Sequence, residues 1–339
     1  MGGRRMSEEK LLEGTEERRE KELSSIDRLF QDIRQYCTGA EFMKKLEFYS
    51  KFPYIGAYNA ALVEEQRPGA RFVLTARKWK KEYQRKIKLN SRPVMILLPF
   101  YPVEFLFDIS DTEPIHTNPY YDDDQVIEDI IKDHMASCVQ DIGEYFRNLE
   151  INLPKNGINY NHDYIVGSEL RAETRVDSSE KLRIQVFKDL RIVHHNHFAI
   201  SVDFKAKGAE ELALLFHELA HLFCRHIAYS WWKVRSCTKE EKEFEAETVS
   251  YLVCRRLGIN YNPMKYLAGY VDSDLEIPNI SLDSIFRAVD QIELLAKGYV
   301  EISKSFLYKN DDTFKKIVDE ERKRIRNERA RAKSVQQSF

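Results

Sequence analysis

From residue 126 onward, apolar positions recur mainly at helical spacing. They do so most clearly over residues 209–226, where leucine and phenylalanine return every three or four residues and define one face of a helix. The same period predicts helices over residues 126–149, 241–256 and 281–303. Short apolar runs predict strands over residues 182–187 and 197–203. The second strand leads directly into the helix over 209–226.

The first third of the chain combines short helical patterns with strand patterns. Helices are predicted over residues 25–36, 40–52 and 58–65. Strands are predicted over residues 71–75, 93–99 and 103–109, the last two joined by a turn at Tyr101-Pro102. The fold class expected for the whole chain is therefore α+β.

These patterns divide the chain into four parts. Residues 1–24 are more than half charged and carry no aromatic residue, so we expect a flexible extension. A small α+β domain is predicted over residues 25–120, ending in an acidic loop, and a larger domain over residues 121–310. Residues 311–339 form a basic tail, for which a solvated helix is the simplest interpretation.

Composition narrows the class of protein. The 339 residues are 43% apolar and 12% aromatic, enough to fill two cores. No apolar run approaches the length of a membrane span, and the amino terminus does not resemble a signal sequence, so we expect a cytoplasmic protein that does not bind membranes. The five cysteines are odd in number and lack C-x-x-C spacing, which predicts reduced thiols.

The strongest chemical signal is His217-Glu218-Leu219-Ala220-His221, inside the helix predicted over 209–226. Residues four apart share a helix face, so both imidazoles can bind one metal while Glu218 faces the water that this metal carries. This is the H-E-x-x-H arrangement of zinc peptidases. A catalytic zinc has three protein ligands and one open position, so a third ligand is expected further along the chain.

The third ligand is expected in the helix over 241–256, where Glu243, Glu245 and Glu247 lie close together. Glu245 falls on the apolar stripe of that helix, and we predict that it completes the site. Glu247 is the alternative ligand, or a residue that orients a histidine.

The remaining histidines carry weaker signals. His226 follows His221 by five positions, so we expect it to point elsewhere and to be structural. His194, His195 and His197 are interpreted as exposed histidines at a strand end, with a place in the cleft as the alternative.

A second chemical signal is a stretch of basic residues. Residues 67–92 contain ten Lys or Arg and one acid, Glu82, with Phe72, Trp79 and Tyr83 between them. Cations that neutralise phosphates beside aromatic rings that stack on bases are typical of single-stranded DNA binding. Surface lysines around a buried Trp79 are the simpler alternative on composition alone.

Several short sequence motifs occur along the chain in a fixed order. This order is more specific to a protein family than any one motif alone. In the first domain they are Tyr54-Ile55-Gly56-Ala57-Tyr58-Asn59, Gln66-Arg67-Pro68-Gly69-Ala70, Trp79-Lys80-Lys81-Glu82, Arg92-Pro93 and Phe107-Asp108-Ile109-Ser110-Asp111-Thr112. In the second they are His217 to His221, Glu243-Phe244-Glu245-Ala246-Glu247, Cys254-Arg255-Arg256-Leu257-Gly258 and Tyr266-Leu267-Ala268-Gly269-Tyr270. Over residues 25–298 the chain resembles the antirestriction protein ArdC and its relatives.

The resemblance implies a single-strand DNA-binding domain ahead of a zincin-like metallopeptidase domain of the ImmA/IrrE type. Together with the basic stretch, it suggests these DNA-binding residues: Tyr54, Asn59, Gln66, Arg67, Arg71, Trp79, Lys80, Lys81, Arg85 and Lys86. It also implies a protein substrate, such as a repressor or a defence-related protein. In zincins an edge strand holds the extended substrate, and we expect residues 197–203 to be that strand.

The expected activity is hydrolysis of a peptide bond at Zn2+ held by His217, His221 and Glu245, with Glu218 as the general base. The main alternative is an antirestriction protein that binds single-stranded DNA and whose metal site is structural or vestigial. A regulator that senses metal or stress is a third option.

Overall fold

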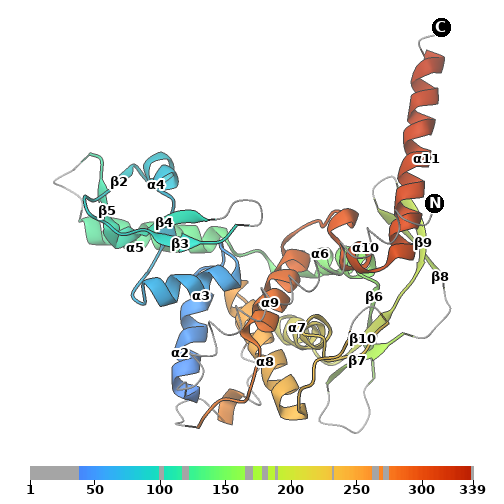
Figure 1. Ribbon diagram of the computed structural model, residues 1–339, viewed down its shortest axis with the longest axis horizontal. Helices are drawn as coiled ribbons and strands as arrows, with labels where there is room; N and C mark the ends of the chain where they lie inside the picture. The colour runs from blue at the N-terminus through green and yellow to red at the C-terminus, as the bar shows by residue number, and fades with distance from the viewer. Residues whose placement is uncertain are drawn as a thin grey trace, which may run out of the picture. The chain divides into compact units, whose positions relative to one another are not determined.

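The computed structural model of the protein describes residues 38–98, 103–116, 122–164, 171–177, 182–187, 190–230, 233–261, 267–269 and 275–336 (Figure 1). The extension predicted at 1–24, the helix predicted at 25–36 and the turn at Tyr101-Pro102 lie outside these residues. The fold is a mixed α+β structure, which confirms the predicted class. No helix among the described residues is both long and apolar enough to cross a bilayer.

The chain forms two compact units. The first comprises Met1–His134, Lys239–Thr248 and Met264–Arg287, and the second comprises Met135–Thr238, Val249–Pro263 and Ala288–Phe339. Each unit therefore combines segments that are far apart in the sequence, whereas the predicted domain ranges are contiguous.

Two helices open the described part of the first unit. Helix α2, Gly39–Ser50, begins at a capping box in which Thr38 and Glu41 satisfy each other's backbone N–H groups. Helix α3, Ala57–Gln66, packs against it, and its alanines are buried in the core. Both helices were predicted, and their ends differ from the predicted ones by one or two residues.

The first unit contains two small antiparallel sheets. One has the strand order β1-β4-β3, from Val73–Leu74, Glu104–Asp108 and Val94–Ile96. The other pairs β2, Arg85–Ile87, with β5, Thr112–Pro114. The predicted strands over 71–75, 93–99 and 103–109 are confirmed in shorter form.

Helix α4, Ala76–Tyr83, lies inside the basic stretch, where the sequence pattern did not predict a helix. Thr75 caps it, because its hydroxyl accepts a hydrogen bond from the Lys78 N–H at 3.2 Å. Gln84 ends it in the left-handed conformation, with φ of 51°. The signal was weak because charged residues surround the single buried residue, Trp79.

The helix predicted over 126–149 is wrong as a single element. Helix α5, Asp123–Ser137, and helix α6, Ile142–Lys155, replace it. Asp141 starts the second helix by accepting a hydrogen bond from the Gly143 N–H at 2.8 Å. A side chain that caps a new helix competes with continuation of the old one, and the apolar period alone did not reveal this.

The second unit is built on a sheet with the order β6-β10-β7. Strand β10, Phe198–Asp203, is parallel to β6, Ile158–Asp163, and antiparallel to β7, Ala172–Val176. The central strand is the predicted 197–203 strand, so the expectation that it is an edge strand is wrong. Because both of its edges are already paired, it has no free edge for a substrate. Strands β8, Leu182–Phe187, and β9, Leu190–His195, form a separate ribbon.

Helix α7, Ala209–Phe223, follows β10 after a short turn and carries the H-E-x-x-H residues (Figure 1). Helix α8, Lys239–Arg256, ends before Gly258, whose φ of +69° favours glycine. This confirms both predicted helices to within a few residues at their ends.

The chain closes with helix α9, Leu282–Lys297, helix α10, Phe306–Asn310, and helix α11, Asp312–Gln336. The first half of α11 packs on β9 through a cluster of Ile192, Ile302, Leu307, Phe314 and Val318. The basic residues predicted to be helical lie in its second half.

Candidate metal centre

Helix α7 brings the two histidines of the motif together. His217 Nε2 and His221 Nε2 are 3.1 Å apart, and both rings are half-buried. Two nitrogen ligands about 2.0–2.1 Å from a tetrahedral zinc lie about 3.3 Å apart. The separation of the two donor atoms is therefore close to that of two nitrogen ligands of one zinc ion. The two histidines belong to a set of three residues, with Glu243, that could hold a metal ion.

His226 contacts this pair, although the sequence predicted that it points elsewhere. Its Nδ1 lies 3.0 Å from His221 Nδ1, and its ring is buried. When His221 Nδ1 is the donor and His226 Nδ1 is the acceptor, this contact leaves the Nε2 lone pair of His221 for a metal. The expectation that His226 points elsewhere is therefore wrong.

A turn at the end of α7 explains this contact. Arg225 adopts the left-handed conformation with φ of 60°, and the His226 N–H donates to the His221 carbonyl at 2.9 Å. The Arg225 N–H donates to the Leu222 carbonyl at 3.0 Å, which completes a Schellman motif. Arginine is uncommon in this conformation, so the sequence gave no signal for the turn.

Glu218 is buried and held in place. Its Oε2 accepts a hydrogen bond from the Thr174 hydroxyl at 2.7 Å. Thr174 lies on β7, opposite Ile200 of the central strand, and is separated from Glu218 by 44 positions in the chain. One carboxylate oxygen is thus fixed by the sheet, which orients the other.

The glutamates of α8 were the candidates for the third ligand. Glu245 is fully buried, and its Oε1 accepts a hydrogen bond from the Ser281 N–H at 2.7 Å, just before α9 begins. Glu247 Oε2 accepts a hydrogen bond from the Leu267 N–H at 2.8 Å. Glu243 is half-buried. Glu245 and Glu247 thus have roles in capping backbone N–H groups, while their roles toward a metal stay predictions.

The strand-end histidines differ from the expectation of exposed side chains. His194 is buried against Phe314, and burial lowers its pKa. His197 is partly buried, with Nδ1 2.5 Å from the Tyr229 hydroxyl and Nε2 3.4 Å from Asp311; burial also lowers its pKa. Of the three, only His195 is exposed.

Two of the aromatic residues predicted to contact DNA serve the core of the first unit. Trp79 is fully buried, and its Nε1 donates to the Phe107 carbonyl at 2.8 Å. The Tyr54 hydroxyl accepts a hydrogen bond from the Val73 N–H at 3.1 Å, and its ring packs on Phe72. The geometry favours the simpler interpretation, in which exposed lysines surround a buried tryptophan.

Two polar side chains that were predicted to contact DNA form hydrogen bonds with backbone groups of the first unit. Asn59 Nδ2 donates to the Leu97 carbonyl at 2.9 Å, while its Oδ1 accepts from the Leu97 N–H at 3.0 Å. Gln66 forms the same pair of bonds with Met95, at 2.8 and 2.9 Å. Helix α3 thereby satisfies the backbone along β3 with amide side chains.

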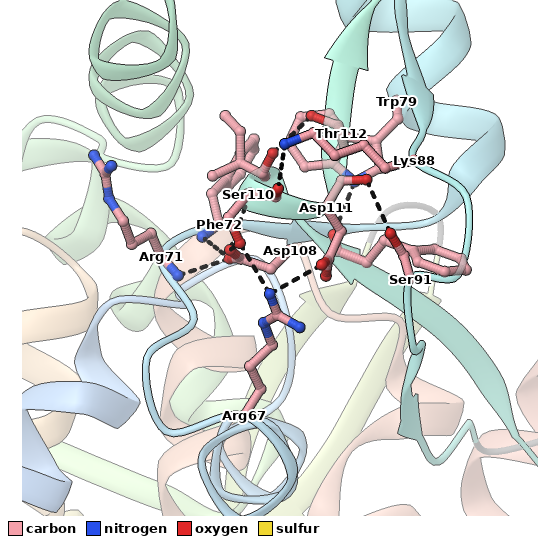
Figure 2. Close-up of polar contacts among 12 residues, drawn as sticks. Arg67, Arg71, Phe72, Trp79, Lys88, Ser91, Asp108, Ser110, Asp111 and Thr112 are labelled. Carbon is pink, nitrogen blue, oxygen red and sulfur yellow. Dashed lines mark hydrogen bonds and ion pairs between the residues drawn. The ribbon is translucent and has the colours of Figure 1, made fainter. Parts of the chain in front are cut away.

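Arg67 belongs to a polar network around β4 (Figure 2). Its Nη2 donates to Asp111 Oδ1 at 2.9 Å and to the Ser110 hydroxyl at 3.0 Å. Asp108 accepts hydrogen bonds from the Arg71 and Phe72 N–H groups at 2.7 and 3.0 Å. The Phe107 to Thr112 block is therefore a folded corner that joins β4 to β5.

The other predicted cations divide into paired and exposed groups. Arg85 is buried and donates to Thr112 Oγ1 at 2.7 Å and to Asp123 Oδ1 at 2.6 Å. Arg71 pairs with Glu128, and Lys86 Nζ lies 3.1 Å from Glu113. Lys80 and Lys81 are exposed on α4.

Comparison with known proteins adds no assignment. No protein-family model matches the chain, and neither the curated proteins nor the solved structures contain a significant match.

Proposed function

We propose that this protein is a zinc-dependent peptidase whose centre is built on α7. The observation that carries the proposal is the 3.1 Å spacing of the two Nε2 atoms of His217 and His221, next to a buried carboxylate whose orientation is fixed. A structural zinc site normally has four side-chain ligands and does not need a Glu218. An open site needs such a base.

The third ligand is proposed to be a glutamate of α8. Glu243 belongs to the same set of possible metal ligands as His217 and His221, whereas Glu245 belongs to a different set, with Cys224 and His226. We favour Glu243, because Glu245 already caps the Ser281 N–H from a fully buried position. Glu243→Gln should then lower the zinc content of the purified protein, whereas Glu245→Gln should lower stability more than zinc content. The opposite pattern would restore Glu245 as the ligand.

The chemistry follows from the positions of these side chains. Bound zinc would polarise the scissile carbonyl and lower the pKa of the attacking water. Glu218 takes the proton from this water and delivers it to the leaving amine. Thr174 keeps the second oxygen of Glu218 occupied, so that a single oxygen faces the reaction. Strand β7 pairs on one side only among the described strands, and its other edge would hold an extended peptide.

Glu218→Gln tests the proposal. The variant should keep its fold and its zinc, and hydrolysis of a fluorogenic peptide library should fall by about a hundredfold or more. Glu210→Gln, which makes the same change near the start of α7, is the control and should retain activity. Unchanged hydrolysis in Glu218→Gln would exclude this mechanism.

We also propose association with single-stranded DNA. The support is the cationic surface of α4, where Arg77, Lys78, Lys80 and Lys81 are exposed. Within the described part of the chain, Lys80 and Lys81 form no ion pair. A DNA-associated protein is then the substrate class we favour. The alternative, an antirestriction protein that acts by binding DNA, predicts that the biological effect survives Glu218→Gln but not Lys80→Ala with Lys81→Ala.

Binding of a labelled oligothymidylate, followed by fluorescence anisotropy at several salt concentrations, tests the DNA proposal. Affinity should fall steeply with salt, because each phosphate contact releases about 0.7 counterions from a single strand. A flat salt response would contradict it.

A further inference from the structure

Helix α5 is acidic and lies against the basic part of the first unit. Residues 122–133 contain six Asp or Glu and one Lys. None of the α5 residues is fully buried, and its apolar residues Val126, Ile127, Ile130 and Ile131 are partly buried. Polar contacts of Asp123, Glu128 and His134 add to this packing.

The two ends of α5 are anchored firmly. At the start, Asp123 forms two hydrogen bonds with Arg85, at 2.6 and 3.0 Å, and Arg85 is 2% exposed. These bonds hold the pKa of Asp123 below its usual range. Near the other end, His134 Nδ1 lies 3.0 Å from the Tyr83 hydroxyl, and its ring packs on Tyr54 and Phe72.

The middle of α5 is attached differently. Glu128 pairs with Arg71, and the side chains are 61% and 48% exposed. Figure 2 shows the Arg71 side chain extending away from the Asp108 network, although its backbone N–H donates to Asp108. An exposed pair of this kind is weak and is screened by salt, so another anion can replace Glu128.

We propose that Glu128 occupies Arg71 as an internal substitute for a phosphate, and that single-stranded DNA binds this surface by displacing Glu128. Arg71 and the exposed cations of α4 then form one phosphate-binding surface, while Asp123 and His134 keep α5 attached. This inference rests on the proposed DNA association and adds that α5 limits its affinity.

Glu128→Gln tests the inference with a matched control. It removes one negative charge and keeps the size of the side chain. Asp129→Asn makes the same change of charge at the next position, where the carboxylate accepts a hydrogen bond from Gln125 on α5 itself at 3.0 Å. Glu128→Gln should raise the affinity for labelled oligothymidylate about threefold to tenfold at low salt, and Asp129→Asn should raise it less.

A double-mutant cycle adds a readout that net charge alone cannot mimic. Arg71→Gln should weaken binding more in the Glu128→Gln background than in the wild type, because only there is Arg71 available to phosphate without competition. The salt dependence of Glu128→Gln should be steeper by about 0.7 in the logarithmic slope, as expected for one added phosphate contact.

The outcomes separate this inference from the DNA proposal. If the wild type binds and Glu128→Gln behaves like Asp129→Asn, the internal competition is absent while DNA binding stands. If neither protein binds the oligonucleotide at low salt, both ideas fall. Circular dichroism and urea unfolding of each variant establish that α5 remains folded, and unfolding of Glu128→Gln alone would replace competition with a purely structural role.

Discussion

At the scale of single residues, the centre on α7 depends on partners that lie outside the H-E-x-x-H pentapeptide. Thr174 holds the proposed general base, and His226 holds the outer nitrogen of a proposed ligand. Neither residue is part of a recognisable motif. Their roles follow from orientation, because a ligand or base acts only when the correct atom faces the reaction.

Thr174 gives the first prediction. Thr174→Val removes the hydroxyl but keeps the shape, so kcat for peptide hydrolysis should fall about tenfold while KM changes little. Thr174→Ser should restore most of kcat, because it returns the donor. Zinc content should be the same in all three proteins. A loss of activity that serine does not rescue would indicate that the threonine only packs.

His226 gives the second prediction. His226→Ala should weaken zinc binding about tenfold to a hundredfold, as expected when the partner that orients a metal-binding histidine is lost. Competition with a fluorescent chelator measures this affinity. His195→Ala is the control, because His195 is exposed. Equal zinc affinity in the wild type and His226→Ala would show that the contact between the two histidines is not needed.

At the scale of elements, side chains of one helix satisfy the backbone of a strand. Gln66 of α3 forms two hydrogen bonds with Met95 of β3, and Asn59 forms two with Leu97, the residue that follows β3. This pairing takes the place of a neighbouring strand, since β3 lies at the end of the β1-β4-β3 sheet. The resemblance suggested both residues as DNA contacts, and the geometry supports a role in folding.

Asn59→Ala tests that role and gives the third prediction. It leaves one backbone donor and one acceptor of Leu97 without these partners, so the free energy of unfolding should fall by about 1–3 kcal/mol. Urea unfolding measures this change. Lys80→Ala, on the exposed side of α4, should change it by less than about 0.5 kcal/mol. If Asn59→Ala instead lowers only DNA affinity, the predicted contact is correct.

At the scale of the whole molecule, three histidines are kept neutral by the fold. Burial lowers the pKa of His134, His194 and His197; His134 is in the first unit, and the other two are in the second. A histidine whose pKa is lower in the folded than in the unfolded protein takes up its proton more readily on unfolding. The stability that it contributes is therefore present above the unfolded pKa of about 6.5 and is lost as the pH falls from there.

The fourth prediction concerns this pH range. The free energy of unfolding should decrease between about pH 7.5 and pH 5.5, by up to about 1.4 kcal/mol per pH unit for each buried histidine. Urea unfolding with a chelator present excludes a contribution from zinc release. His194→Gln should reduce the slope, and His195→Gln, at an exposed side chain, is the control. A flat profile for the wild type would contradict the assignment of neutral, buried imidazoles.

The sequence by itself determined the features that depend on near neighbours. Spacing of four residues places His217 and His221 on one helix face, apolar period locates α7 and α8, and Gly258 marks a helix end. These are local, because helix geometry relates residues within a few turns. The same locality explains the error at α5 and α6, where one capping aspartate divides a continuous apolar period.

Only the tertiary structure decided which distant groups meet. It brought the Thr174 hydroxyl to Glu218 across 44 positions, buried the Trp79 side chain of the basic helix α4, and paired Glu128 with Arg71. It also brought His226 into contact with His221, because the chain turns at Arg225 in the left-handed conformation. An arginine in the sequence does not predict that conformation. Packing between elements selects these contacts, and the spacing of residues along the chain carries little information about it.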